Sequence, residues 1–125
     1  MNIFMKRTFT LEDVREHYSD KRIEHIKGML MTLEKVKSEY RLSKSFSKRL
    51  ESACLMHDIG KKYEDIYCDH PFYRIMHGHL SAEMAKRIYK INDNDILLSI
   101  ILQPSEGAPM SMLARFLYPL EFCEI

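Results

Sequence analysis

The chain has 125 residues, of which 46% are hydrophobic and 30% are charged, and its formal net charge is +1. This balance is typical of one globular domain and excludes a disordered chain. The small net charge argues against a protein that coats nucleic acid, although it leaves room for a local basic pocket. No segment approaches the roughly 20 apolar residues that a membrane-crossing helix requires. We therefore expect a single soluble domain over residues 1–125.

The chain contains three cysteines, and no two of them form a Cys-x-x-Cys pair. This pattern argues against a disulfide framework or a thiolate zinc site, so we expect a reducing, cytoplasmic setting. The first ten residues lack the long apolar run of a signal peptide. Cys54 lies on an apolar stripe and is expected to be a small buried hydrophobe. The nine methionines fit a homodimer interface and fit core filling equally well.

The apolar residues repeat with helical spacing along nearly the whole chain, and no strand alternation is present. The expected elements are helices over about 10–19, 20–36, 46–57, 77–91 and 92–103, a short helical or irregular piece over 61–69, and a last helix from 111. Thr10 is the expected first cap, Gly60 is expected to end the third helix in a left-handed conformation, and Pro119 must kink or shorten the last helix. The sequence thus predicts an all-α fold, a single compact bundle of five or more helices.

Four polar residues lie on helix faces that are otherwise apolar. His57 continues the buried stripe of the third helix, and Asp58 follows at its end. His25 leans inward from the second helix, and His77 continues the stripe of the fourth helix backwards. His79 instead shares a face with charged residues and should point to solvent. Buried imidazole and carboxylate groups are costly unless they are paired or bind a metal, so the four together indicate a metal site.

Each of these residues alone has a simple structural interpretation. A single inward histidine is more often a core residue bonded to a carbonyl oxygen, and a carboxylate before Gly60 can stabilise a turn. His17 and His70 show no inward pattern, so we expect both of them in solvent. Only the combination of four inward residues favours the metal site.

The run over 53–61, ACLMHDIGK, resembles the signature of the HD superfamily of metal-dependent phosphohydrolases, in which apolar residues precede His-Asp-x-x-Lys. The upstream segment KRIEH, over 21–25, is similar to the first histidine segment of that family. Three later segments resemble the YqeK-like branch, whose members are iron-dependent and split diadenosine tetraphosphate into two ADP: HGHLSA over 77–82, DNDIL over 93–97 and PMSML over 109–113. The resemblance covers about residues 20–125.

This resemblance implies a site for one or two divalent metal ions, with iron as the first choice and manganese or zinc as alternatives. His25, His57 and Asp58 would hold one ion, and Asp58 would bridge to a second ion bound by His77. Glu121 stands where the branch carries the aspartate that closes the first site.

Two positions depart from the pattern of the branch. Gln103 stands where the branch supplies a further histidine, and an amide oxygen is a poor replacement for imidazole on a transition metal. Glu121 keeps the negative charge of the aspartate but is one methylene longer. The resemblance therefore leaves open a copy of the family in which the second metal and part of the activity are lost.

The resemblance also implies roles in the hydrolysis of a nucleotide phosphoanhydride. Asp58 and Lys61 would be catalytic, and Arg22, Lys61 and Ser81 would contact the substrate. Each has a simpler alternative: Lys61 as a solvated lysine, Arg22 paired with Asp20, and Ser81 as a small core residue. An adenine ring would need an apolar wall, for which the candidates are Tyr63, Phe72 and Tyr73.

Three functions follow from these patterns. The first is symmetrical hydrolysis of diadenosine tetraphosphate, and the second is hydrolysis of another substrate, a nucleoside monophosphate or a cyclic nucleotide, by an HD phosphohydrolase. The third is a nucleotide-binding or interaction domain that has lost metal ligands. In each case the expected partner is a small nucleotide, and neither nucleic acid nor a membrane is expected.

Overall fold

The computed structural model describes residues 8–63 and 73–102, and for 73–77 and 102 it describes the helical backbone alone. Within these ranges the chain forms the following helices, in order: α1 (Leu11–Val14), the 3-10 helix η1 (Arg15–His17), α2 (Asp20–Glu39), α3 (Lys44–Met56), α4 (Tyr73–Arg87) and α5 (Asn94–Leu102). The expected all-α fold is confirmed, with five α-helices packed together and no strand in the described part. The last expected helix, from Ser111, lies outside these ranges.

Short polar side chains fix where the first three helices begin. The carboxylate of Asp13 accepts the backbone N–H of Thr10 at 2.7 Å, which caps α1 as expected. Ser19 caps α2, and Ser43 caps α3 by accepting the N–H of Phe46 at 3.1 Å. Helix α3 therefore starts at Lys44, about two residues before the expected boundary, because Ser43, between the two expected helices, is its cap.

Helix α4 begins and ends about four residues earlier than its apolar pattern indicated. Lys90 adopts a left-handed conformation with φ 61°, and the N–H of Ile91 donates to the carbonyl oxygen of Ala85 at 3.1 Å. The left-handed residue ends the helix and reverses the chain, and the hydrogen bond from Ile91 reaches back six residues to α4. Ile91 is buried, so the apolar pattern continues past the point where the helix has stopped. Asp93 then caps α5 by accepting the N–H of Asp95 at 3.0 Å.

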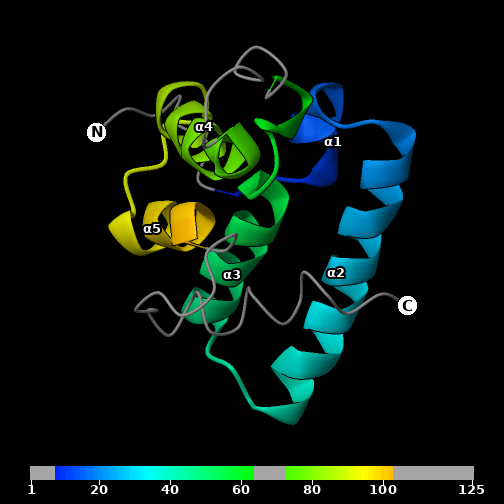
Figure 1. The fold of residues 1–125 in the computed structure, drawn as a ribbon. Helices are drawn as coiled ribbons and strands as arrows, with labels where there is room; N and C mark the ends of the chain where they lie inside the picture. The colour runs from blue at the N-terminus through cyan, green and yellow to red at the C-terminus, as the bar shows by residue number, and fades with distance from the viewer. Residues whose placement is uncertain (1–7, 64–72, 103–125) are drawn as a thin grey trace.

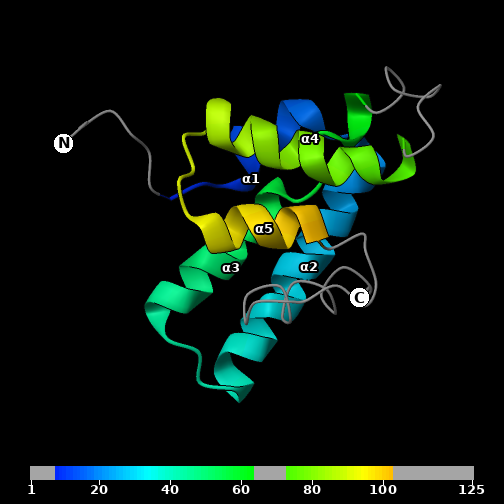
Figure 2. The same cartoon turned by 60° about the vertical axis from the view of Figure 1, so that its left-hand side comes forward.

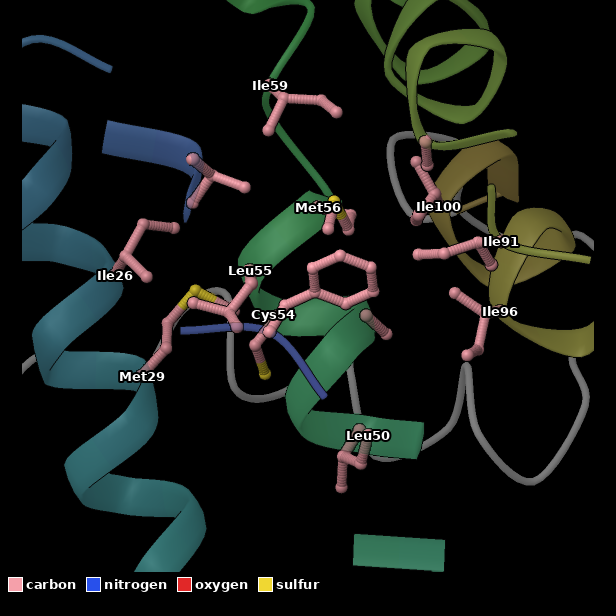
Figure 3. Close-up of a cluster of buried hydrophobic side chains, with 14 of the residues drawn as sticks. Ile26, Met29, Leu50, Cys54, Leu55, Met56, Ile59, Ile91, Ile96 and Ile100 are labelled. Atoms are coloured by element: carbon pink, nitrogen blue, oxygen red, sulfur yellow. The ribbon is translucent and has the colours of Figure 1, made fainter. Parts of the chain in front are cut away.

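Helix α3 is the centre of the molecule and packs against α2 on one side and α5 on the other, while α4 lies alongside α5 (Figures 1 and 2). Figure 3 shows the side chains of α3 between those of α2 and those of α5. Cys54 is fully buried, as expected for a small apolar residue. The largest fully buried side chains are Ile26, Met29, Leu33, Leu50, Leu55, Met56, Ile59 and Ile100.

The chain leaves α3 through a tight turn over 57–60 and a 3-10 turn over 61–63. Gly60 does not adopt the left-handed conformation expected from the sequence. A Cβ atom at this position would lie 2.7 Å from the backbone nitrogen of Ser81 and 3.0 Å from the carbonyl carbon of Leu80. Glycine is needed because α4 passes directly over this turn. The N–H of Gly60 donates to the hydroxyl of Ser81 at 2.8 Å and ties the turn to α4.

None of the helices in the described part of the chain is long and apolar enough to cross a membrane. The longest of them, α2, carries charged residues in both its first and its second half.

Candidate functional site

His57 and Asp58 lie together at the end of α3, and both side chains are almost completely buried. The Nδ1 atom of His57 lies 2.7 Å from the carbonyl oxygen of Cys54, which can only accept, so Nδ1 carries the hydrogen. In the neutral ring Nε2 then presents a lone pair, and it lies 3.3 Å from Oδ2 of Asp58. Two acceptors at this distance need a cation or a proton beside them. A histidine whose other nitrogen donates to a carbonyl is also the usual arrangement of a metal ligand.

Tyr18 holds this end of α3 in place. Its hydroxyl donates to the carbonyl oxygen of Leu55 at 2.7 Å and accepts the backbone N–H of Asp58 at 3.3 Å. One buried hydroxyl thus satisfies a helix carbonyl and fixes the backbone of Asp58. The sequence reasoning missed Tyr18, since nothing in the local pattern shows that a residue next to the cap of α2 reaches α3.

Helix α2 supplies two further side chains from one face, because they lie three residues apart. The Arg22 guanidinium forms an ion pair with Oδ2 of Asp58, and 27% of the Arg22 side chain is exposed. The sequence reasoning had considered Asp20 as its partner and had not considered Asp58. His25 is half-buried, and its ring centroid lies 6.2 Å from that of His57. His25 therefore lies near His57, which adjoins Asp58, and its role as a metal ligand stays a prediction.

A cavity of about 450 Å³ opens beside Asp58. A volume of this size is within the usual range of small-molecule sites. Among the lining residues that the structure describes, three are cationic: Arg22, Lys61 and Lys62. Asp58 is the only carboxylate among them, so the lining is net positive. The described lining residues are His17, Tyr18, Ser19, Arg22, Asp58, Lys61 and Lys62. The ammonium of Lys62 is held at the wall by the carbonyl oxygen of Glu16, 3.3 Å away.

The family model described as HD domain matches residues 22–121. The chain belongs to the HD domain family. The matched range begins at Arg22 and contains His25, His57 and Asp58. HD domains generally bind divalent metals and are typically metal-dependent phosphohydrolases, so the match supports that class of activity. No curated protein matches the chain in a direct comparison.

The side chains at the HD motif fit a divalent metal by their chemistry. Imidazole nitrogens and a carboxylate are the donor set that suits iron, manganese and zinc, and the hydrogen bond to Cys54 leaves Nε2 of His57 as the ligand atom. In the described part of the chain, no three His, Cys, Asp or Glu side chains are close enough to form a finished metal cage. The other expected ligands, the side chains of His77 and Glu121, lie outside the described residues, as does Gln103.

Ser81 is fully buried in the HD fold, and its hydroxyl accepts the N–H of Gly60. This is the small core residue considered as one of its two roles, and contact with a nucleotide stays a prediction. His79 is exposed, as its face of α4 indicated. Of the three residues considered for an adenine wall, only the side chain of Tyr63 is described; those of Phe72 and Tyr73 are not.

The expectation that His17 lies in solvent is wrong. Only 7% of this residue is exposed, and its ring nitrogens lie 3.2 Å from the hydroxyl of Tyr63 and 2.9 Å from that of Tyr89. Tyr89 donates to the carbonyl oxygen of Asp13, so Nε2 of His17 must donate to Tyr89, and Tyr63 donates to Nδ1. Burial lowers the pKa of His17 and raises the pKa of Tyr89 to about 12. The partners are 46 and 72 residues away, so no local pattern could show them.

Proposed function

We propose that this HD domain is a divalent-metal-dependent phosphohydrolase that cleaves a nucleotide phosphoanhydride. The observation that supports the proposal is the arrangement of His57 and Asp58: a lone pair of imidazole and a buried carboxylate oxygen lie 3.3 Å apart beside a positively lined cavity. The Arg22 guanidinium pairs with this oxygen now, and a divalent ion in its place would have the imidazole and the carboxylate as ligands, while the positive lining attracts a phosphorylated ligand. Neither feature is explained by core packing alone.

His25, His57 and Asp58 would hold the ion, and His77 and Glu121 are proposed to complete the ligand set by the family resemblance. We propose iron as the metal, with manganese or zinc as alternatives, and one or two ions. When bound, a divalent ion supplies positive charge for phosphate oxygens and makes water more acidic near neutral pH.

The chain's own residues carry the remaining work in this proposal. Lys61 lines the cavity next to Asp58 and would neutralise charge that develops on the phosphate oxygens. Arg22, with its planar fork of donors, would orient the phosphate. Tyr18 would keep the backbone of Asp58 fixed, so that the carboxylate stays in its productive position.

Diadenosine tetraphosphate is the substrate that the segments after His77 favour. A water oxygen would attack one of the two central phosphorus atoms, and the bond from this phosphorus to the oxygen that bridges the central pair would break. One ADP leaves with the bridging oxygen, and the other keeps the oxygen of water. The products are two ADP and no other nucleotide.

The test is product analysis with protein purified without air and loaded with Fe²⁺ or Mn²⁺. We expect chromatography to show diadenosine tetraphosphate converted to ADP alone, and elemental analysis to show one or two bound ions per chain. Asp58→Asn should lose both the metal and the activity. Asp20→Asn, an exposed aspartate at the start of α2, is the matched control and should retain both.

Other outcomes separate the alternatives. Release of inorganic phosphate from a nucleoside monophosphate, or opening of a cyclic nucleotide, would instead favour another HD phosphohydrolase. Bound metal without turnover of any nucleotide would contradict hydrolysis.

The second candidate function is a nucleotide-binding domain without catalysis. The observation in its favour is Gln103, which stands where the YqeK-like branch carries a histidine. Nucleotide binding in metal-free protein, with no turnover after metal is added, would support it.

A further inference from the structure

Two groups with opposite requirements meet at one oxygen atom of the site. Oδ2 of Asp58 forms the ion pair with the Arg22 guanidinium, and the same Oδ2 lies 3.3 Å from Nε2 of His57. The side chain of Asp58 is only 2% exposed, so its charge depends on a nearby cation. In this structure Arg22 supplies such a cation, on the carboxylate that would hold the ion together with His57.

A guanidinium and a divalent ion cannot both sit favourably on that oxygen. Both are positive, and at contact distance inside the protein their repulsion is screened far less than in water. Uptake of the ion must therefore weaken or break the pair between Arg22 and Asp58. Loss of the ion favours the pair again, because a buried carboxylate is stabilised by a cation in contact with it.

The cavity beside Asp58 can hold the Arg22 side chain when the ion pair is broken. It lies in the first turn of α2, its side chain is 27% exposed, and it lines the same cavity as Lys61 and Lys62. A small rotation of the side chain leaves the guanidinium inside this positively lined space. There it would be a bidentate donor for a phosphate group.

We propose that Arg22 is a placeholder cation: it neutralises Asp58 in the metal-free protein and passes to the phosphate of the ligand when a divalent ion binds. This proposal rests on the proposed function in taking a phosphorylated ligand. It makes metal binding and phosphate binding cooperative through one side chain, and by linkage each strengthens the other by the same factor. In the metal-free protein Arg22 stays paired with Asp58, so the site binds phosphate weakly.

The first test is the Mn²⁺ affinity of metal-stripped protein, measured by titration calorimetry on the wild type and on Arg22→Gln. The variant lacks the Arg22 guanidinium as a competitor for Asp58, so its Kd for Mn²⁺ should be lower by about fivefold or more. Arg15→Gln is the matched control, because Arg15 pairs with Glu12 at the surface, 2.7 Å away and outside the cavity; its Kd should stay at the wild-type value. An unchanged or higher Kd in Arg22→Gln would overturn the proposal.

A second variant covers the case in which Arg22→Gln does not fold without metal. Arg22→Lys keeps one positive charge and loses the fork, so we expect a Kd for Mn²⁺ between those of the wild type and a site without competitor. A Kd equal to or above that of the wild type would contradict competition. The melting temperature of metal-free Arg22→Gln should also fall, and its rise on saturation with Mn²⁺ should exceed that of the wild type.

The third test separates competition from simple repulsion by titrating inorganic phosphate. Arg22→Gln should bind phosphate more weakly than the wild type in both states, because the cavity loses one positive charge, but the loss should be several-fold larger with Mn²⁺ bound than without metal. An equal loss of phosphate affinity in both states would mean that metal binding does not move Arg22 from Asp58 to the phosphate, which overturns the proposal. Failure of the nucleotide assay with these binding results intact would remove the proposed hydrolysis alone. Absence of Mn²⁺ binding in every protein would remove both.

Discussion

Gly60→Ala is the substitution whose effect follows most directly from the structure. The added Cβ would lie 2.7 Å from the backbone nitrogen of Ser81 and 3.0 Å from two atoms of Leu80. Two of these three atoms belong to the α4 backbone, so no side-chain rotation can remove the contact. The turn or α4 has to move, and the hydrogen bond from Gly60 to Ser81, 2.8 Å long, is lost with that movement.

Two contributions set the loss of unfolding free energy in Gly60→Ala. Overpacking of a tight contact costs about 1–3 kcal/mol of unfolding free energy. Loss of the hydrogen bond costs about 1 kcal/mol more, which gives a total of about 2–4 kcal/mol. For a domain of this size that corresponds to a fall in melting temperature of about 8–16 °C. Asp58 and Lys61 flank Gly60, so the movement should also weaken Mn²⁺ binding.

The assay is urea denaturation of metal-free Gly60→Ala and Ser81→Ala beside the wild type, followed by Mn²⁺ titration. Ser81→Ala removes the same hydrogen bond without adding an atom, so it is the matched control and should keep the wild-type affinity for Mn²⁺. The double variant should cost less than the sum of the two, because both remove one bond. A Gly60→Ala protein as stable as the wild type would refute the close approach as the reason for glycine.

Three further changes test other parts of the structure. Burial lowers the pKa of His17 below 6.5, so the folded state prefers the neutral ring, and stability should fall as the pH drops below about 6.5. The charge of Glu16 opposes this fall and that of Lys62 adds to it. In melting curves recorded over a pH series, His17→Gln should make stability less dependent on pH in this range. Tyr18→Phe should cost about 1–3 kcal/mol in urea denaturation, because it leaves a buried carbonyl and N–H without their hydroxyl; no change would argue against that role. The Arg49 ion pair lowers the pKa of Asp93 below 3.8, so its stabilisation is present above that pH and is lost in stronger acid. Arg49→Gln should lower the free energy of unfolding by only about 1 kcal/mol, since the pair is a third exposed. A denaturation curve of the variant at pH 7 that matches the wild-type curve would contradict this expectation.

The sequence by itself determined the all-α class and the burial of His57, one residue of the candidate site. Apolar spacing gave the all-α class, and the cap at Thr10 gave the start of α1. It also placed His57 correctly, because a histidine on the buried stripe of a helix cannot face solvent. Boundaries failed where the apolar pattern crossed a chain reversal, as at Ile91, which is buried although α4 has already ended.

The tertiary structure alone decided which distant groups meet. Tyr18 reaches Asp58 across 40 residues, and His17 becomes buried because Tyr63 and Tyr89 close over it. Hydrogen bonds of this kind depend on how α1, α3 and α4 pack, and no local periodicity records that packing. Gly60 shows the same limit: the sequence predicted a left-handed residue that ends α3, whereas glycine is required there because the close approach of α4 excludes a side chain.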